Sequence, residues 1–380
     1  MSLTVVVIIG LTAIGIVGLW PRARPSFDLA AIGFADSVVT AKVTSVFEGS
    51  CSFSPELECR AVVFELGDGS VTSQEFDASP SSPRLEVGDR VVLNVINDAD
   101  PLFRYQYADR DRRVPLSLVA ALFGLAVVGL GRIKGIAALA GLAASIAVLL
   151  GFVAPAILAG RDPVAVATFG GIAIALVTLY LAHGWRAPTH VAVIGTFLAL
   201  LLTMMLSLLV EPFMAFSGFS SEESLFLGLL DGVQVAGLVL AGAVLGAIGA
   251  LDDVTVTQVS AVMELRAVNP DLSRDRLFRG GLRIGRDHIA STINTLLLAY
   301  AGAALPLLLL LTLSNLPLAM MANSEVVATE IARTLLGSIG LVAAVPITTW
   351  LAARTLPAST PVIVVSRPRR LPRQRGPTSL

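Results

Sequence analysis

The chain has 380 residues, of which 55% are hydrophobic and only 14% are charged, and its net charge is −1. Soluble globular proteins carry roughly 25% charged residues, so this composition excludes an ordinary water-soluble domain. The near-neutral charge also argues against nucleic acid as a partner. We therefore expect a protein whose main partner is the lipid bilayer.

Eight apolar segments are long enough to cross a bilayer, which takes about 20 helical residues. They are residues 3–20, 114–130, 136–158, 164–183, 191–210, 225–251, 289–313 and 331–353. No Lys or Arg precedes the first segment and no persuasive A-x-A site follows it, so we expect residues 1–25 to be a retained anchor rather than a cleaved signal peptide. The other seven segments predict a helical bundle over residues 114–355.

Residues 26–113, between the first two segments, have the pattern of β structure. The stretches "SVVTAKVTSVF" and "RAVVFEL" are rich in β-branched residues, and "GDGS" is a hairpin turn signal. About five short strands would suit a small barrel similar to an OB fold. Cys51 and Cys59 lie in this region, either as a disulfide in an oxidising compartment or as two buried thiols.

Arginine residues predict the orientation, because basic residues gather on the cytoplasmic side of a membrane. Six Arg residues lie between the sixth and seventh segments and six more follow the eighth, whereas residues 211–224 and 314–329 contain no basic residue. We expect both termini to be cytoplasmic and residues 26–113 to be extracytoplasmic. The Arg- and Pro-rich residues 356–380 are expected to form a disordered cytoplasmic tail.

The sixth segment contains glycines four residues apart, at Gly228 and Gly232 and again at Gly242 and Gly246. Small residues at this spacing let a second helix approach closely in a membrane. We therefore expect these four glycines to pack against another helix.

A polar stripe follows the sixth segment directly, in "LDDVTVTQVSAVMEL". On a helical wheel, Asp253, Thr257, Ser260 and Glu264 fall within an arc of about 60°. One side of a short amphipathic helix would then carry two carboxylates with hydroxyls between them, and Asp252 directly precedes Asp253 as a further candidate path residue. Two structural interpretations remain open: an aspartate caps a helix, or the stripe is the solvated face of an interfacial helix.

The start of the seventh segment, "RDHIASTINTLLLAY", carries a second polar flank. Its members are Asp287, His288, Ser291, Thr292, Asn294 and Thr295. A buried Asn294 is costly in a bilayer unless it has a polar partner or faces water. Because the sixth and seventh segments meet at one membrane face, both flanks could line one acidic cytoplasmic cavity. Asp231 would mark either the outer end of such a path or the membrane interface.

The sequence contains no P-loop, nucleophile elbow or H-E-x-x-H helix. His183, His190 and His288 all fall on the expected cytoplasmic side, but no pair has ligand spacing on one helix. We expect no enzyme activity, no cofactor, no metal site and no ATP-driven transport by this chain alone.

The two polar stretches carry a resemblance. Residues 246–270, "GAIGALDDVTVTQVSAVMELRAVNP", and residues 285–311, "GRDHIASTINTLLLAYAGAALPLLLLL", resemble motifs of the YibE/F-like family of multi-pass bacterial membrane proteins. The resemblance implies an anchor, a small extracytoplasmic β domain and a hydrophobic bundle in the bacterial cytoplasmic membrane. It implies an architecture rather than an activity. The motif positions in this chain are Gly246, Gly249, Asp252 or Asp253, Ser260, Glu264, Asp287, Asn294, Thr295 and Tyr300.

The fold class we expect is an α-helical polytopic membrane protein with about eight transmembrane helices and a small β domain. Polar half-helices without a nucleotide site favour a secondary transporter or channel-like permease for a small ion or solute, with protons or cations first because the flanks are acidic. The alternative is a membrane scaffold or envelope-assembly factor that binds a partner through its outer β domain. A water-accessible cavity at Asp253 and Asn294 would favour transport, and dry packing would favour the scaffold.

Overall fold

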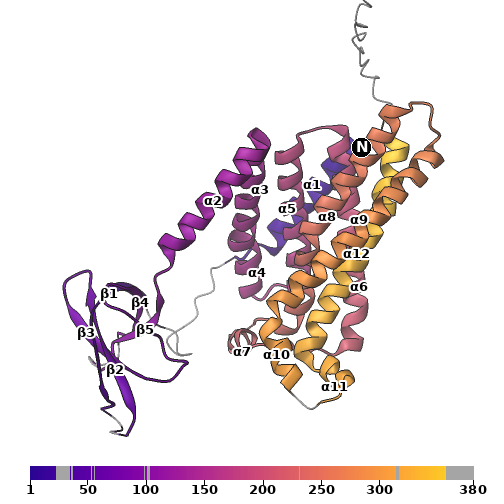
Figure 1. Ribbon diagram of the computed structural model, residues 1–380. Helices are drawn as coiled ribbons and strands as arrows, with labels where there is room; N and C mark the ends of the chain where they lie inside the picture. The colour runs from indigo at the N-terminus through magenta and orange to yellow at the C-terminus, as the bar shows by residue number, and fades with distance from the viewer. Residues whose placement is uncertain are drawn as a thin grey trace, which may run out of the picture.

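The computed structural model describes residues 1–22, 35, 37–52, 54, 56–97, 99–100, 103–230, 232–313 and 316–356. These residues form a mostly helical bundle and a small curled sheet beside it (Figure 1). Asp231 and, apart from Leu356, the predicted tail 356–380 lie outside the described residues.

Seven helical segments in the described chain are long and apolar enough to cross a membrane. They are α1 (Ser2–Leu19), α2 (Arg113–Gly131), the run of α3 (Ile133–Val148), η2 (Leu149–Val153) and α4 (Ala154–Leu158), then α5 (Pro163–His183), α6 (Ala187–Met214), α8 (Val235–Val268) and α12 (Glu325–Thr355). An eighth crossing is present if α9 (Arg274–Ala303) and α10 (Leu305–Leu313), which meet at a bend of 68°, count as one broken span. By length and composition, the described chain therefore has seven candidate spans, and it has the predicted eight if this bent pair is one span.

Helix α8 is the centre of the bundle and packs against α5, α6, α9 and α12. Its buried face contributes Val244, Ile248 and Leu251 to the main core cluster, where they join apolar residues of α5, α6 and α12. The N-terminus and the Arg-rich α8–α9 connection lie at one end of the bundle, and α7 (Glu222–Gly228), α10 and α11 (Leu318–Asn323) lie at the other (Figure 1).

The predicted sixth segment, residues 225–251, is wrong at both ends. Its first residues belong to the separate short helix α7, and Gly232 then adopts a φ of +85°, a left-handed conformation that interrupts a helix. Helix α8 begins only at Val235 and continues through Asp252 and Asp253 to Val268. The predicted short amphipathic helix is therefore the second half of α8, and neither aspartate caps a helix.

The packing role predicted for the first glycine pair is also wrong. Gly228 lies in α7 and Gly232 lies in the following turn, so the two do not share one helical face. A Cβ atom at Gly228 would collide with the ring of Phe219, which is a local contact rather than a helix–helix interface.

The sheet contains β1 (Ser37–Ser50), β2 (Glu58–Leu66), β3 (Val71–Asp77), β4 (Arg90–Val95) and β5 (Tyr105–Arg110), in the spatial order β3-β2-β1-β4-β5 with antiparallel pairing. It curls until its edges meet: the backbone N–H of Tyr107 donates to Gln74 Oε1 at 2.7 Å. Val43, Phe64 and Leu93 fill the space inside the curl. Cys51 and Cys59 form a disulfide where β1 and β2 meet.

Candidate functional site

Asp252 lies in the middle of α8 and has only one of its two carboxylate oxygens satisfied. Thr178 of α5 donates its hydroxyl to Asp252 Oδ2 at 2.7 Å. The other oxygen, Oδ1, is buried and has no hydrogen-bond partner among the described residues. A buried polar atom without a partner costs about 1–3 kcal/mol, so this oxygen is poised to accept a proton or a cation.

Asp252 lines a pocket of about 350 Å³ that is bounded by α3, α5 and α8. On α3 the wall consists of Ala137, Ala138 and Gly141, whose small side chains leave the space open. On α5 it includes Thr178 and His183, and on α8 both aspartates. An acidic pocket is thus present, but it lies on the α3 and α5 side of α8. No residue of α9 is among its described lining residues, so this pocket is not a cavity between the sixth and seventh segments.

Asp253 connects this pocket to α9. Its Oδ2 lies 3.4 Å from His288 Nε2, a contact that is an ion pair only when the imidazole is protonated, and this ring nitrogen has no hydrogen-bond partner among the described residues. The Asp253 side chain is 65% exposed, so its carboxylate is accessible from outside the bundle, whereas the Nε2 atom of His288 is buried. No group of three or more His, Cys, Asp or Glu residues in the described chain is arranged to hold a metal ion.

The other predicted path residues do not line the pocket. Thr257 is half-buried, and the rest are exposed on the outer surfaces of α8 and α9: Ser260, Glu264, Asp287, Ser291, Asn294 and Thr295. Helix α9 packs on α8 and α12 through the face that carries Gly281 and Gly285. Asp287 and Asn294 lie on the opposite face of α9 and therefore point outward. The wheel predicted which residues share a face but not which neighbour that face meets.

Sequence reasoning missed a buried polar seam between α8 and its neighbours. Thr255 and Thr196 of α6 are joined by a hydroxyl–hydroxyl hydrogen bond of 2.9 Å, and Thr349 of α12 donates to Gln258 Oε1 at 2.8 Å. All four side chains are buried. Their signal in the sequence was weak, because an isolated Thr in an apolar segment is common and is usually satisfied by its own helix. Thr178 was missed for the same reason.

The second glycine pair, Gly242 and Gly246, lies within α8 as predicted, but it makes room for side chains rather than for another backbone. A Cβ atom at Gly242 would lie 2.8 Å from Arg333 Nε of α12, and one at Gly246 would collide with the hydroxyl of Tyr300 of α9. Gly249, one turn further on, faces open space.

The helical part of the chain is similar to a known protein family. The family model described as YibE/F-like protein matches residues 119–358, which is more than half of the chain and includes every residue that lines the pocket. No curated protein and no solved structure matches the chain.

Proposed function

This chain belongs to the YibE/F-like family, and we propose that it is a multi-pass permease of the bacterial cytoplasmic membrane that carries a small cation through the pocket at Asp252. The observation that carries the proposal is the buried Oδ1 atom of Asp252, which has no partner in the described structure and belongs to a residue of that pocket. An ionisable residue deep inside an apolar helix is costly, and such residues mark ion and substrate pathways.

The charge of the pocket favours a cation. Two carboxylates and the imidazole of His183 line it, and no Lys or Arg is present among its described lining residues. Its volume of about 350 Å³ suits an ion with some of its water or a small solute rather than a lipid or a peptide. The exposed carboxylate of Asp253 at the rim gives an arriving cation a second acidic group to meet.

The alternative is a scaffold that binds a partner through the outer sheet. Phe47 and Val71 support it, because both are large apolar side chains more than 60% exposed on the strands. The curled five-stranded arrangement also supports an OB-like barrel, a fold whose surface commonly binds ligands. The bundle favours transport over this alternative, because Asp252 lines a pocket instead of being packed dry against a neighbour.

The experiment that tests the proposal compares two carboxylates in the same membrane protein. A deletion strain is complemented with wild type, Asp252→Asn or Asp287→Asn and profiled for growth and uptake across metal ions and pH. We expect Asp252→Asn to lose the phenotype at normal membrane abundance. Asp287→Asn should retain it, because Asp287 is exposed on the outer surface of α9. Full complementation by Asp252→Asn would contradict the proposal, and complementation lost only by variants of the sheet would favour the scaffold.

A further inference from the structure

The hydroxyl group of Thr178 is close to three acceptor oxygens and has a single hydrogen to share among them. Its Oγ1 atom lies 2.7 Å from Asp252 Oδ2 of α8, 2.9 Å from the backbone oxygen of Ile174 and 3.3 Å from that of Ala175, both in the preceding turn of α5. A hydroxyl donates one hydrogen bond but can also accept. The two shortest contacts are therefore two oxygen pairs for which Thr178 supplies only one hydrogen.

Of the groups in these two contacts, only the carboxyl of Asp252 can supply the second hydrogen. A protonated carboxyl is a donor as well as an acceptor. If Asp252 holds a proton on Oδ2, it donates to Thr178 Oγ1, and the threonine donates onward to the carbonyl of Ile174, so both short contacts are hydrogen bonds. If Asp252 is ionised, Thr178 donates to Oδ2 instead, and its contact with Ile174 contains no hydrogen.

The other oxygen of Asp252 also favours the neutral acid. Oδ1 is buried, and no donor in the described residues reaches it. An ionised carboxylate spreads its charge over both oxygens and needs donors at each, whereas in the neutral acid Oδ1 is an uncharged carbonyl oxygen. Burying an ionised carboxylate without a partner costs far more than burying a neutral polar group. The surroundings of Asp252 therefore stabilise its protonated form over the anion.

No permanent cation offsets the cost of a charge on Asp252. No Lys or Arg is among the described residues that line its pocket, and α3 contributes only small apolar residues. The ionisable lining residues besides Asp252 are His183 on α5 and Asp253 on α8, and Asp253 in turn contacts His288 of α9. The carboxylate of Asp253, next in the chain, would repel a second negative charge.

The same surroundings suit a metal ion poorly. Calcium and magnesium ions take about six or more oxygen ligands. Apart from the two aspartates, the described lining of this pocket has one side-chain oxygen, the hydroxyl of Thr178. A metal ion at Asp252 Oδ1 would have to keep most of its water beside the apolar wall of α3, whereas a proton needs a single oxygen.

We propose that the cation bound at Asp252 is a proton, and that Thr178 is a positioning residue which accepts a hydrogen bond from the neutral acid and donates one to the anion. The hydroxyl rotates between Ile174 and Asp252 as the proton binds and leaves, so Oδ2 keeps a partner in both states. Only the O–H bond of Asp252 forms or breaks, and the proton is exchanged with water in the pocket. The role of this proton in transport rests on the permease proposed above, but its binding does not.

Infrared difference spectroscopy of the full chain in lipid bilayers tests the proposal, with the proton as the probe. Raising the pH should remove a C=O band of a protonated carboxyl, and this band should move to lower frequency in D2O, where the acidic hydrogen is replaced by deuterium. We expect Asp252→Asn to lose the band. Thr178→Val should move it to higher frequency, because a hydrogen bond from the acid lowers its C=O frequency, and Thr178→Ser should restore the wild-type position.

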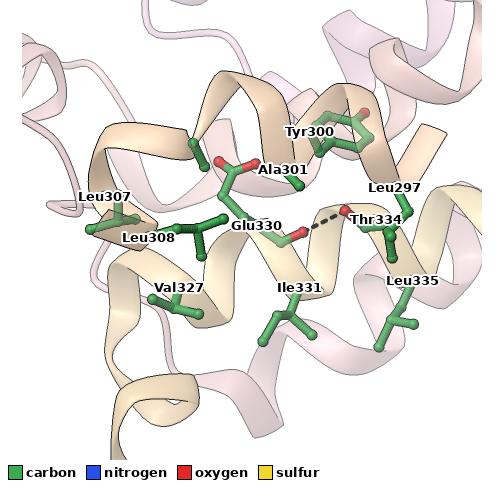
Figure 2. A pocket seen from close by; sticks show the side chains of 11 residues that line it. Leu297, Tyr300, Ala301, Leu307, Leu308, Val327, Glu330, Ile331, Thr334 and Leu335 are labelled. Atoms are coloured by element: carbon green, nitrogen blue, oxygen red, sulfur yellow. Dashed lines mark hydrogen bonds between the residues drawn. The ribbon is translucent and has the colours of Figure 1, made fainter. Parts of the chain in front are cut away.

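Glu330 of α12 gives the matched control, because its carboxylate also enters a pocket of the bundle. Figure 2 shows it directed toward the bend between α9 and α10, where the lining is mostly apolar. Arg333 Nη1 donates to Glu330 Oε1 at 2.6 Å, so this carboxylate has the permanent cationic partner that Asp252 lacks. Glu330→Gln should therefore keep the band at the wild-type frequency.

The Thr178 variants retain the carboxyl group, so the test stays decisive if Asp252→Asn folds poorly. A band that persists in Asp252→Asn, a band at the same frequency in Thr178→Val and wild type, or a band removed by sodium or magnesium at constant pH would overturn the proposal. The two proposals also fail separately. An Asp252 band in a protein that carries no ionic current would refute the permease alone, whereas sodium or magnesium currents without that band would refute proton binding alone.

Discussion

At the scale of single residues, the two adjacent aspartates of α8 have different environments despite identical chemistry. Asp252 is half-buried, with one oxygen held by Thr178 and the other unpartnered in the described structure. Asp253 points outward and meets His288 of α9. A rotation of 100° per residue on a helix suffices to separate a buried acceptor from an exposed rim charge. The pocket therefore contains one deep and one accessible carboxylate.

The hydrogen bond from Thr178 can be tested by a matched pair of variants. Thr178→Val removes the donor and leaves both oxygens of Asp252 without a partner, which should lower the free energy of unfolding by about 1–3 kcal/mol. Thr178→Ser keeps the hydroxyl and should stay close to wild type. Thermal unfolding in detergent measures both. If the valine variant were as stable as wild type, the bond would contribute nothing to the position of Asp252.

At the scale of elements, α8 and α9 approach closely because glycines line their contact. A Cβ atom at Gly285 would lie 2.5 Å from Val345 Cγ1 of α12 and 2.8 Å from the amide of Gln258. This close approach holds Gln258 against Thr349. The buried seam therefore depends on Gly285 of α9 having no side chain.

Two glycines of α9 give a direct test of that packing. Gly285→Ala should destabilise the bundle by about 1–3 kcal/mol, because the methyl group overpacks a filled contact. Gly302→Ala, on the same helix with nothing within 4 Å, should change stability by no more than about 1 kcal/mol and in the stabilising direction. The measurement is the unfolding midpoint of each variant in the same detergent. Equal midpoints would show that the contact tolerates a side chain.

Sequence patterns predicted some of these elements and missed others. Apolar length predicted most of the long apolar helices, because a run of apolar residues of that length is itself the signal. It failed after α7, where Gly232 turns the chain inside the predicted segment. The helical wheel grouped Asp253 with Ser260 and Glu264, but it could not predict that α3 and α5 would build the pocket. Whether a side chain such as Thr178 meets Asp252 depends on how each helix is rotated about its axis in the bundle. No local sequence pattern predicts that rotation.

At the scale of the whole molecule, a permease must present the two ends of its bundle to different compartments. The Arg-rich α8–α9 connection lies at the same end as the N-terminus, and α11 lies at the opposite end (Figure 1). Basic connections remain on the cytoplasmic side. We therefore expect a cysteine introduced at Met320 to react with a membrane-impermeant maleimide on intact cells, and one at Arg274 to react only after permeabilisation. Labelling of both from the same side would contradict the eight-span topology.

If Asp252 binds a cation on its way through the membrane, the reconstituted protein should move charge across the membrane of a proteoliposome. Concentration jumps of protons, sodium, potassium and magnesium are applied to the reconstituted full chain on a solid-supported membrane. We predict a transient current for at least one cation in wild type and in Asp287→Asn, and none in Asp252→Asn. The amide of that variant can still accept the hydrogen bond from Thr178, so its fold and abundance should persist. Wild-type currents in Asp252→Asn, or no current for any of these cations in wild type, would contradict the account.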